Sequence, residues 1–105
     1  MTLFVAVHKW KPEDFPTILK EVTVLFGGLG KLPKGVELLS TYNRDNGAFC
    51  VWVAPDLAIL KKLFDQHAPV MKKGTEFVPV VQSYPPTVEY VLSLWKTMLA
   101  QAAPK

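Results

Sequence analysis

The residues best suited to chemistry are a histidine and the chain's single cysteine, each in a short apolar segment. His8 lies within residues 3–10, and Cys50 lies with Trp52 within residues 48–54. Both segments have the composition of β-strands, in which alternate side chains share a face. If the faces of the two segments coincide, an imidazole, a thiol and an indole meet in one pocket. His8, Cys50 and Trp52 are therefore candidate ligand-binding residues.

A metal is one ligand that this group suggests. Imidazole and thiolate are ligands for zinc, nickel and copper, so His8 and Cys50 are candidate metal ligands. A secure site usually has three or four protein ligands, and His67 is the candidate third. The competing interpretation is that Cys50 is a small buried apolar residue and His8 a hydrogen-bonded residue at the rim of the core. A mid-strand thiol also lacks the helix N-terminus that would activate it as a nucleophile, so the competing interpretation is favoured.

Aromatic residues suggest a second kind of ligand, a small apolar molecule. Tyr42 is the fourth candidate ligand-binding residue, because its hydroxyl needs a partner if it is buried. Trp52 and three further aromatic residues could line the same pocket, or instead pack in the core and a dimer interface. The three are Trp10, Phe77 and Tyr84. No paired carboxylates, G-x-S-x-G motif or metal-type spacing of Cys and His is present, so the sequence identifies no cofactor and no reaction.

The elements that position these residues follow from the hydrophobic pattern. Apolar, β-branched segments predict four strands. They span residues 3–10, 36–42, 48–54 and 75–83. Pro79 requires the last strand to lie at a sheet edge or to carry a bulge. Amphipathic spacing predicts a helix that ends at Gly27 and a second, capped by Asp56, that stops before Pro69. A third amphipathic helix follows over residues 87–101, before a frayed tail at 101–105.

This order predicts an α+β ferredoxin-like β-α-β-β-α-β sandwich. Residues 1–105 form one domain, with 87–101 as an appended C-terminal helix. Two crossovers place strands 1 and 3 in the middle of a sheet ordered 4-1-3-2, and we expect these two strands to be parallel. A loop over residues 43–47, rich in Asn, Asp and Gly, joins strands 2 and 3 as a hairpin.

Both core helices are expected on one face of this sheet. The other face then carries Phe4, His8, Trp10 or their register mates, which is too apolar to stay in water. Either the third helix folds back over it, or two protomers pack sheet on sheet. The second arrangement is a two-fold symmetric dimer that encloses a barrel.

Composition limits the classes of partner. Twelve basic residues, eleven of them scattered lysines, face nine acidic ones. This pattern is typical of a solvated surface rather than of a nucleic-acid-binding face. A single cysteine excludes an intrachain disulfide framework and fits a reducing compartment. No stretch reaches the roughly 20 apolar residues that cross a bilayer, and the N-terminal apolar run is too short for a signal peptide. We expect a cytoplasmic protein without a membrane or nucleic-acid partner.

Three stretches resemble the dimeric α/β-barrel superfamily, and the chain is similar to short bacterial and archaeal ferredoxin-like families within it. The resemblance covers residues 32–81. Its motifs are Leu32-Pro33-Lys34-Gly35-Val36, Cys50-Val51-Trp52-Val53-Ala54-Pro55-Asp56 and Phe77-Val78-Pro79-Val80. It implies a homodimer with a pocket between the sheet and its covering elements. Members include cofactor-free monooxygenases, haem-dependent enzymes and a small nickel-binding group, but none of their chemistry transfers to this chain residue by residue.

Three functions remain open. The first is a small homodimer that binds an apolar molecule or a metal around His8, Tyr42, Cys50 and Trp52. The second is a cofactor-free oxygenase or isomerase that uses His8 as base. The third is a structural or regulatory dimerisation module without a small ligand. The first two require a cavity that contains His8, whereas the third allows side chains to fill it.

Overall fold

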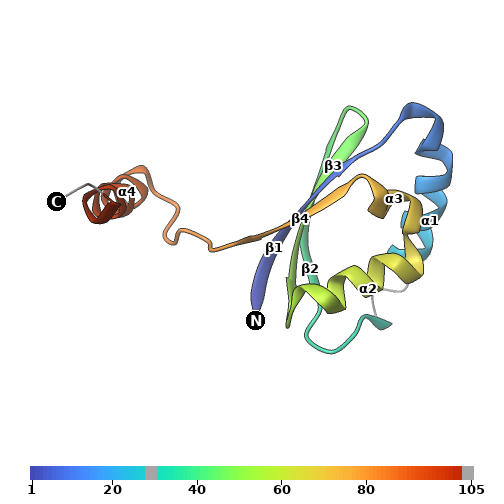
Figure 1. The fold of residues 1–105 in the computed structure, drawn as a ribbon, viewed down its shortest axis with the longest axis horizontal. Helices are drawn as coiled ribbons and strands as arrows, with labels where there is room; N and C mark the ends of the chain where they lie inside the picture. Colours follow the sequence, from blue (N-terminus) through green and yellow to red (C-terminus); the bar gives the residue numbers. More distant parts are fainter. Residues whose placement is uncertain (28–30, 103–105) are drawn as a thin grey trace.

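The computed structural model describes residues 1–27 and 31–102, which form a four-stranded antiparallel sheet with helices over one face (Figure 1). In chain order the elements are β1 (Thr2–Lys9), the 3-10 helix η1 (Pro12–Asp14), α1 (Phe15–Gly27), β2 (Glu37–Arg44), β3 (Gly47–Ala54), α2 (Leu57–His67), α3 (Pro69–Lys73), β4 (Thr75–Val80) and α4 (Val88–Ala102). The predicted α+β class is confirmed, and the arrangement is compatible with a ferredoxin-like fold. Residues 103–105 of the predicted tail, and 28–30, lie outside the described residues.

The sheet has the predicted order, β2-β3-β1-β4, but one predicted direction is wrong. β1 and β3 run antiparallel, because the tight hairpin after β2 reverses the chain before β3 begins. Ala6 therefore pairs with Cys50, and His8 pairs with Ala48. His8 and Cys50 remain diagonal neighbours on one face, a separation of about 7–8 Å in a regular sheet.

The hairpin is tighter than the sequence predicted. Arg44 pairs directly with Gly47, so only Asp45 and Asn46 form the turn. Asn46 has a φ of 51°, a left-handed conformation that Asn tolerates better than most residues. The strands therefore extend further than predicted, and the sheet residues Asn43 and Arg44 lie beside the turn.

The helix boundaries follow the predicted capping signals. Asp56 accepts a hydrogen bond from the backbone N–H of Ile59 at 2.9 Å and so caps α2. α2 ends at His67, as the following Pro69 predicted. Pro69 also occupies the first position of α3, which the sequence analysis missed. Proline at this position is favourable, since its missing N–H has no partner in the helix.

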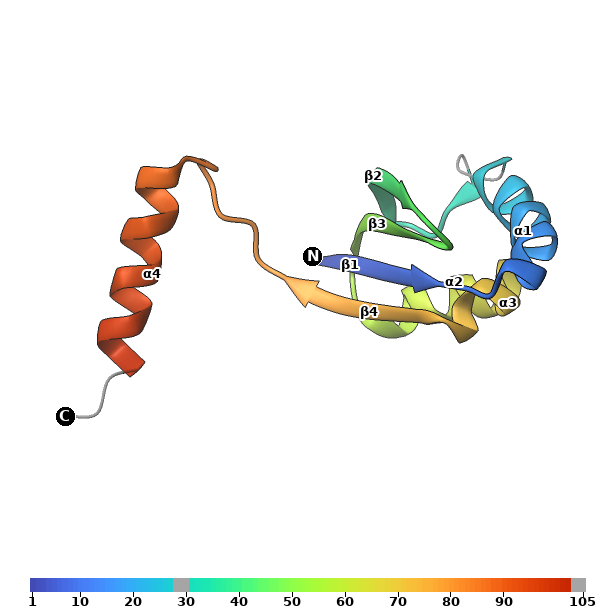
Figure 2. The same cartoon turned by 90° about the horizontal axis from the view of Figure 1, so that it is seen from above.

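The core lies between the sheet and helices α1 to α3 (Figure 2). β1 contributes Phe4, Ala6 and His8 to it. The prediction that Phe4 and His8 lie on the uncovered face is wrong, and their odd-numbered neighbours occupy that face instead. Periodicity alone separates the two faces of a strand but does not say which face the helices cover.

We call the sheet surface on the far side from these helices the open face. Its side chains alternate with the buried residues of β1, β3 and β4, and each is partly exposed. They are Leu3, Val5, Val7, Phe49, Val51, Val53, Val78 and Val80. These eight residues make the surface largely apolar along three neighbouring strands, and Glu76, which pairs with Val7, is a charged residue on the same face. Helices α1, α2 and α3 all lie on the opposite side of the sheet (Figure 1).

Helix α4 stands apart from this body, beyond the end of β4 (Figures 1 and 2). None of its described residues is buried. The radius of gyration is 16.7 Å, against roughly 13 Å for a compact chain of this length. Of the two arrangements expected for the uncovered face, the one in which α4 folds back over its own sheet is not present in this structure. None of the described helices is long and apolar enough to cross a membrane.

Candidate functional site

Three of the four candidate ligand-binding residues come together. His8, Cys50 and Trp52 are buried on the helix-covered face of β1 and β3. Tyr42 does not join them. It pairs with Phe49 on the opposite side of the sheet and is 59% exposed.

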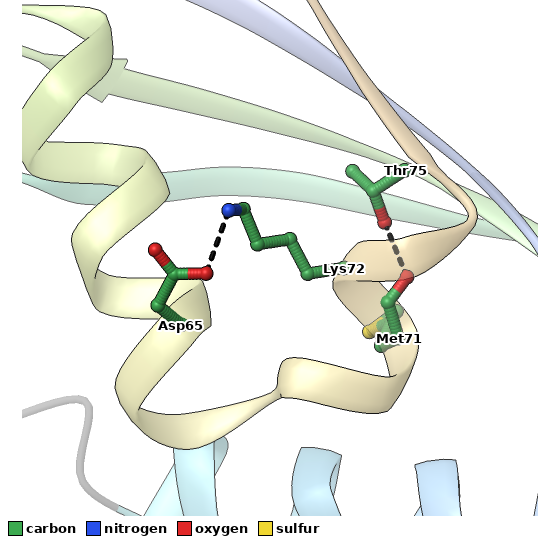
Figure 3. A network of polar contacts seen from close by, with 4 residues as sticks. All are labelled: Asp65, Met71, Lys72 and Thr75. Atoms are coloured by element: carbon green, nitrogen blue, oxygen red, sulfur yellow. Dashed lines mark hydrogen bonds and ion pairs between the residues drawn. The ribbon is translucent and has the colours of Figure 1, made fainter.

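His8 is held by a short chain of hydrogen bonds. Its Nδ1 lies 2.6 Å from the Thr75 hydroxyl, and that hydroxyl donates to the carbonyl oxygen of Met71 at 2.7 Å (Figure 3). A hydroxyl has one proton to donate. Thr75 must therefore accept from His8, which places the imidazole proton on Nδ1 and leaves Nε2 as an acceptor.

The surroundings of His8 favour its neutral form. The side chain is completely buried and stacks on Phe64 with 5.7 Å between ring centroids. Burial lowers the pKa of His8 to about 4. Within the described part of the chain, neither Nε2 of His8 nor Nε1 of Trp52 has a hydrogen-bond partner. His8 is thus a neutral core residue at pH 7, with its free acceptor enclosed by protein.

The metal site is not assembled by this arrangement. Across residues 1–27 and 31–102, no group of three or more His, Cys, Asp or Glu side chains is placed to hold a metal ion. Burial raises the pKa of Cys50 to about 11, which keeps it as a thiol at pH 7. His67, the candidate third ligand, is exposed at the end of α2. His8 and Cys50 supply two of the three or four protein ligands that a secure metal site usually has.

A cleft of about 400 Å³ opens between α1 and the hairpin end of β2 and β3. Cys50 and Ala48 form part of its wall, so one predicted site residue does line a cavity. His8 has no exposed surface, although it pairs with Ala48 of this wall. The remaining lining residues are Trp10, Phe15, Ile18, Leu19, Val22, Phe26, Thr41, Asn43, Arg44, Gly47 and Met71.

The cleft exists because small side chains on the sheet face large ones on the helix. Ala48 and Cys50 leave space that a larger residue would fill, as Trp52 does further along β3. On the helix side, Phe15 and Leu19 remain 43% and 49% exposed. The two surfaces are apolar but do not close on each other.

Polar groups enter the cleft from one edge. Thr41 and Asn43 project from β2, on the same side of the sheet as Cys50 and Ala48 with which they pair. Arg44 is directed otherwise, since its guanidinium carbon lies 5.5 Å from the centre of the Phe49 ring on the open face. A hydroxyl and an amide are therefore the polar groups directed into the cleft, while Arg44 lines it with its guanidinium turned toward Phe49.

The other aromatic residues that were predicted to line the pocket lie in different parts of the structure. Trp10 lines the cleft and stacks on Phe15 at 5.9 Å. Trp52 and Phe77 instead pack against Phe64 in the core. Tyr84 is exposed beyond β4. The sequence analysis missed the α1 wall, for which the signal was the apolar stripe that it assigned wholly to the core.

Helix α3 contributes Met71 to the lining of the cleft. The Glu21 carboxylate of α1 accepts hydrogen bonds from the backbone N–H groups of Val70 and Met71, at 2.8 and 2.9 Å. This carboxylate supplies partners for the first turn of α3. An ion pair of 2.6 Å between Lys72 and Asp65 joins α3 to α2 at the surface (Figure 3).

A second hollow, of about 500 Å³, lies on the other side of Trp10. Its cationic groups are Lys9, Lys11 and Lys73, which are exposed to solvent, and Asp14 stands among them. Exposed lysines beside a carboxylate are well solvated, so ion pairs between this hollow and a ligand would contribute little binding energy. The cleft at Cys50 is the better-formed site. No family model, curated protein or solved structure matches this chain.

Proposed function

We propose that the chain is a small binding protein that holds an apolar molecule in the cleft between α1 and the β2–β3 hairpin. The observation that carries this proposal is the unfilled apolar space between Cys50 and the exposed side chains of Phe15 and Leu19. Apolar surface left open in this way is stabilised when a ligand displaces water from it.

Size and polarity define the class of ligand. A volume of about 400 Å³ is at the lower end of the roughly 300–1,000 Å³ of small-molecule pockets. Thr41 and Asn43 provide both hydrogen-bond donors and acceptors at the mouth. The cleft suits a neutral aromatic or aliphatic molecule with one carbonyl or hydroxyl group directed toward β2.

Binding is better supported than catalysis by an oxygenase or isomerase mechanism. A base has to reach the proton that it removes, and His8 is enclosed on all sides. Its pKa of about 4 also makes the imidazole a weak base. Cys50 reaches the cleft wall, but its thiol is unactivated. The cleft thus contains groups that hold a ligand and none that is prepared for reaction.

Titration with the neutral fluorescent probe N-phenyl-1-naphthylamine tests this proposal. A phenylalanine at position 41 of the exposed edge strand fills the cleft without altering the core, and β2 accommodates an aromatic residue well. We expect Thr41→Phe to weaken probe binding at least about tenfold, as loss of a few buried apolar contacts implies. Ser40→Phe adds the same ring on the opposite face and serves as the matched control.

Equal probe affinity in Thr41→Phe, Ser40→Phe and the parent chain would show that the probe binds elsewhere and would reject the cleft as a ligand site.

A further inference from the structure

We propose that α4 packs on the open face of a second copy of the chain, so that two chains exchange their C-terminal helices. This inference concerns the side of the sheet opposite the cleft and does not depend on a ligand. It rests on two apolar surfaces of the same chain, neither of which is covered by the rest of that chain in the described residues.

The first surface is an apolar stripe along α4, which we call the α4 stripe. Its members recur at helical spacing and share one side of the helix. They are Val88, Val91, Leu92, Trp95, Met98 and Leu99. Trp95 is 63% exposed. Glu89 and Ser93 lie away from the stripe, where they remain in water when the stripe is covered.

Packing on a partner surface would also explain why α4 is a stable helix. Isolated helices of fewer than about 12–15 residues are marginal in water, and most helical stability in proteins comes from packing an apolar face. α4 has 15 residues and its sequence includes the β-branched or aromatic residues Val88, Tyr90, Val91 and Trp95, which are not the strongest helix formers. A stable α4 therefore requires a surface on which the stripe is buried.

The open face is a surface of matching length and polarity. A helix of 15 residues is about 22 Å long. Strands β1, β3 and β4 have 8, 8 and 6 residues, or roughly 20–27 Å at about 3.3 Å per residue. Both surfaces are formed by aliphatic residues with few charges, so each can remove the other from water.

The connection to β4 directs α4 toward another chain. Residues 81–87 leave the sheet in an extended path that carries α4 beyond the end of β4 (Figure 2). Val81 is 96% exposed. Residues 84 and 85 form a bend in this path. An arm that carries an unpacked element away from its own domain is the geometry of an exchanged dimer.

Reciprocal exchange covers both surfaces in both chains. A standard interface buries roughly 1,600 Å² in total, and the two-fold operation makes the same contact twice, so each helix–sheet contact has to bury about half of that area. Trp95, which is 63% exposed, is the largest side chain of the stripe that can contribute to it. Sheet-on-sheet pairing would cover the open face but leave the α4 stripe in water.

Light scattering after size-exclusion chromatography tests the exchange in the full chain. We expect a mass of twice the 11.7 kDa chain. Trp95→Glu removes the central contact and should weaken dimerisation at least about thirtyfold, whereas Ser93→Glu, which adds the same charge on the polar side, should not. Val78→Glu damages the open face, with Glu76→Gln on the same strand face as its control.

A mixture of the two damaged chains distinguishes exchange from other assemblies. Trp95→Glu retains an intact open face and Val78→Glu an intact α4 stripe, so together they regain one helix–sheet contact and a mixed dimer. A Trp95→Glu chain that dimerises like its parent, or a parent chain that stays monomeric, would overturn the proposal. Trp95 is not part of the core, so the sheet domain of Trp95→Glu should fold even if Val78→Glu does not.

Discussion

A neutral imidazole occupies the core at position 8, and its two nitrogens have different surroundings. Nδ1 donates a hydrogen bond to the Thr75 hydroxyl, which in turn donates one to the Met71 carbonyl oxygen. Nε2 has no partner among the described residues. Protonation of Nε2 would place an uncompensated charge in this apolar site, so folding selects the neutral form.

The pKa of His8 gives the protein a specific pH dependence. The unfolded chain binds a proton at this position below about pH 6.5, and the folded chain only below about pH 4. Between these values the unfolded state holds more protons, so stability falls as the pH is lowered from about 6.5 to 4. The expected loss from His8 is about 3 kcal/mol, measured by urea unfolding at pH 7 and pH 4.

His8→Phe isolates this contribution. Phenylalanine fills a similar volume and does not titrate, and Thr75 keeps its hydrogen bond to Met71. The difference in unfolding free energy between pH 7 and pH 4 should shrink by about 3 kcal/mol. An unchanged difference would mean that His8 is protonated equally in both states, and the carboxylates would then account for the acid sensitivity.

At the scale of elements, α3 depends on a carboxylate from another helix. Glu21 accepts from two successive N–H groups of a helix that has only five residues. Glu21→Ala should therefore lower the free energy of unfolding by about 2–3 kcal/mol, the usual range for hydrogen bonds to a charged group. Glu21→Gln keeps one acceptor oxygen and should lose less.

Amide hydrogen exchange shows whether this loss is local. In Glu21→Ala the N–H groups of Val70 and Met71 should exchange faster than in the parent chain. Lys20→Ala changes the neighbouring exposed residue of α1 and is the control. A similar loss of stability in both variants would indicate an effect on helix α1 in general rather than on the Glu21 contact.

Local signals explain which elements the sequence predicts well. Asp56 caps α2 and Pro79 lies in an edge strand, since each position follows from backbone hydrogen bonding within a few residues. α3 was missed because its N-terminus is stabilised by Glu21, which is 49 residues away from Val70 in sequence. The parallel pairing of β1 and β3 was wrong because direction depends on the whole connection through β2.

The candidate site, like the fold, was predicted where the signal is local and missed where it depends on tertiary packing. Alternation along β3 placed Cys50 and Trp52 on one face, and the register of β1 with β3 adds His8 to that face. Alternation along β2 separates Tyr42 from its neighbour Thr41. It could not locate the cleft, whose space depends on how α1 lies above Ala48 and Cys50. Tertiary packing, rather than the type of any one residue, decides which of these side chains reaches a ligand.

At the scale of the whole molecule, the sheet domain and α4 have different requirements. The domain has a continuous core from β1 to β4, whereas α4 contributes no described residue to it. Loss of α4 should therefore leave the folding of the domain largely intact while it removes the proposed contact between chains. Stability measured at several protein concentrations separates these two effects.

Deletion of residues 87–105 provides this comparison. We expect the melting temperature of the full chain to rise with protein concentration, because association stabilises the folded state by mass action. The truncated chain should melt cooperatively at a temperature independent of concentration, below that of the full chain at high concentration. The melting temperatures of both chains are measured by circular dichroism over a hundredfold range of protein concentration. A concentration-dependent melting temperature in the truncated chain would show that the open faces associate without α4, and a truncated chain that does not fold would show that α4 stabilises its own domain.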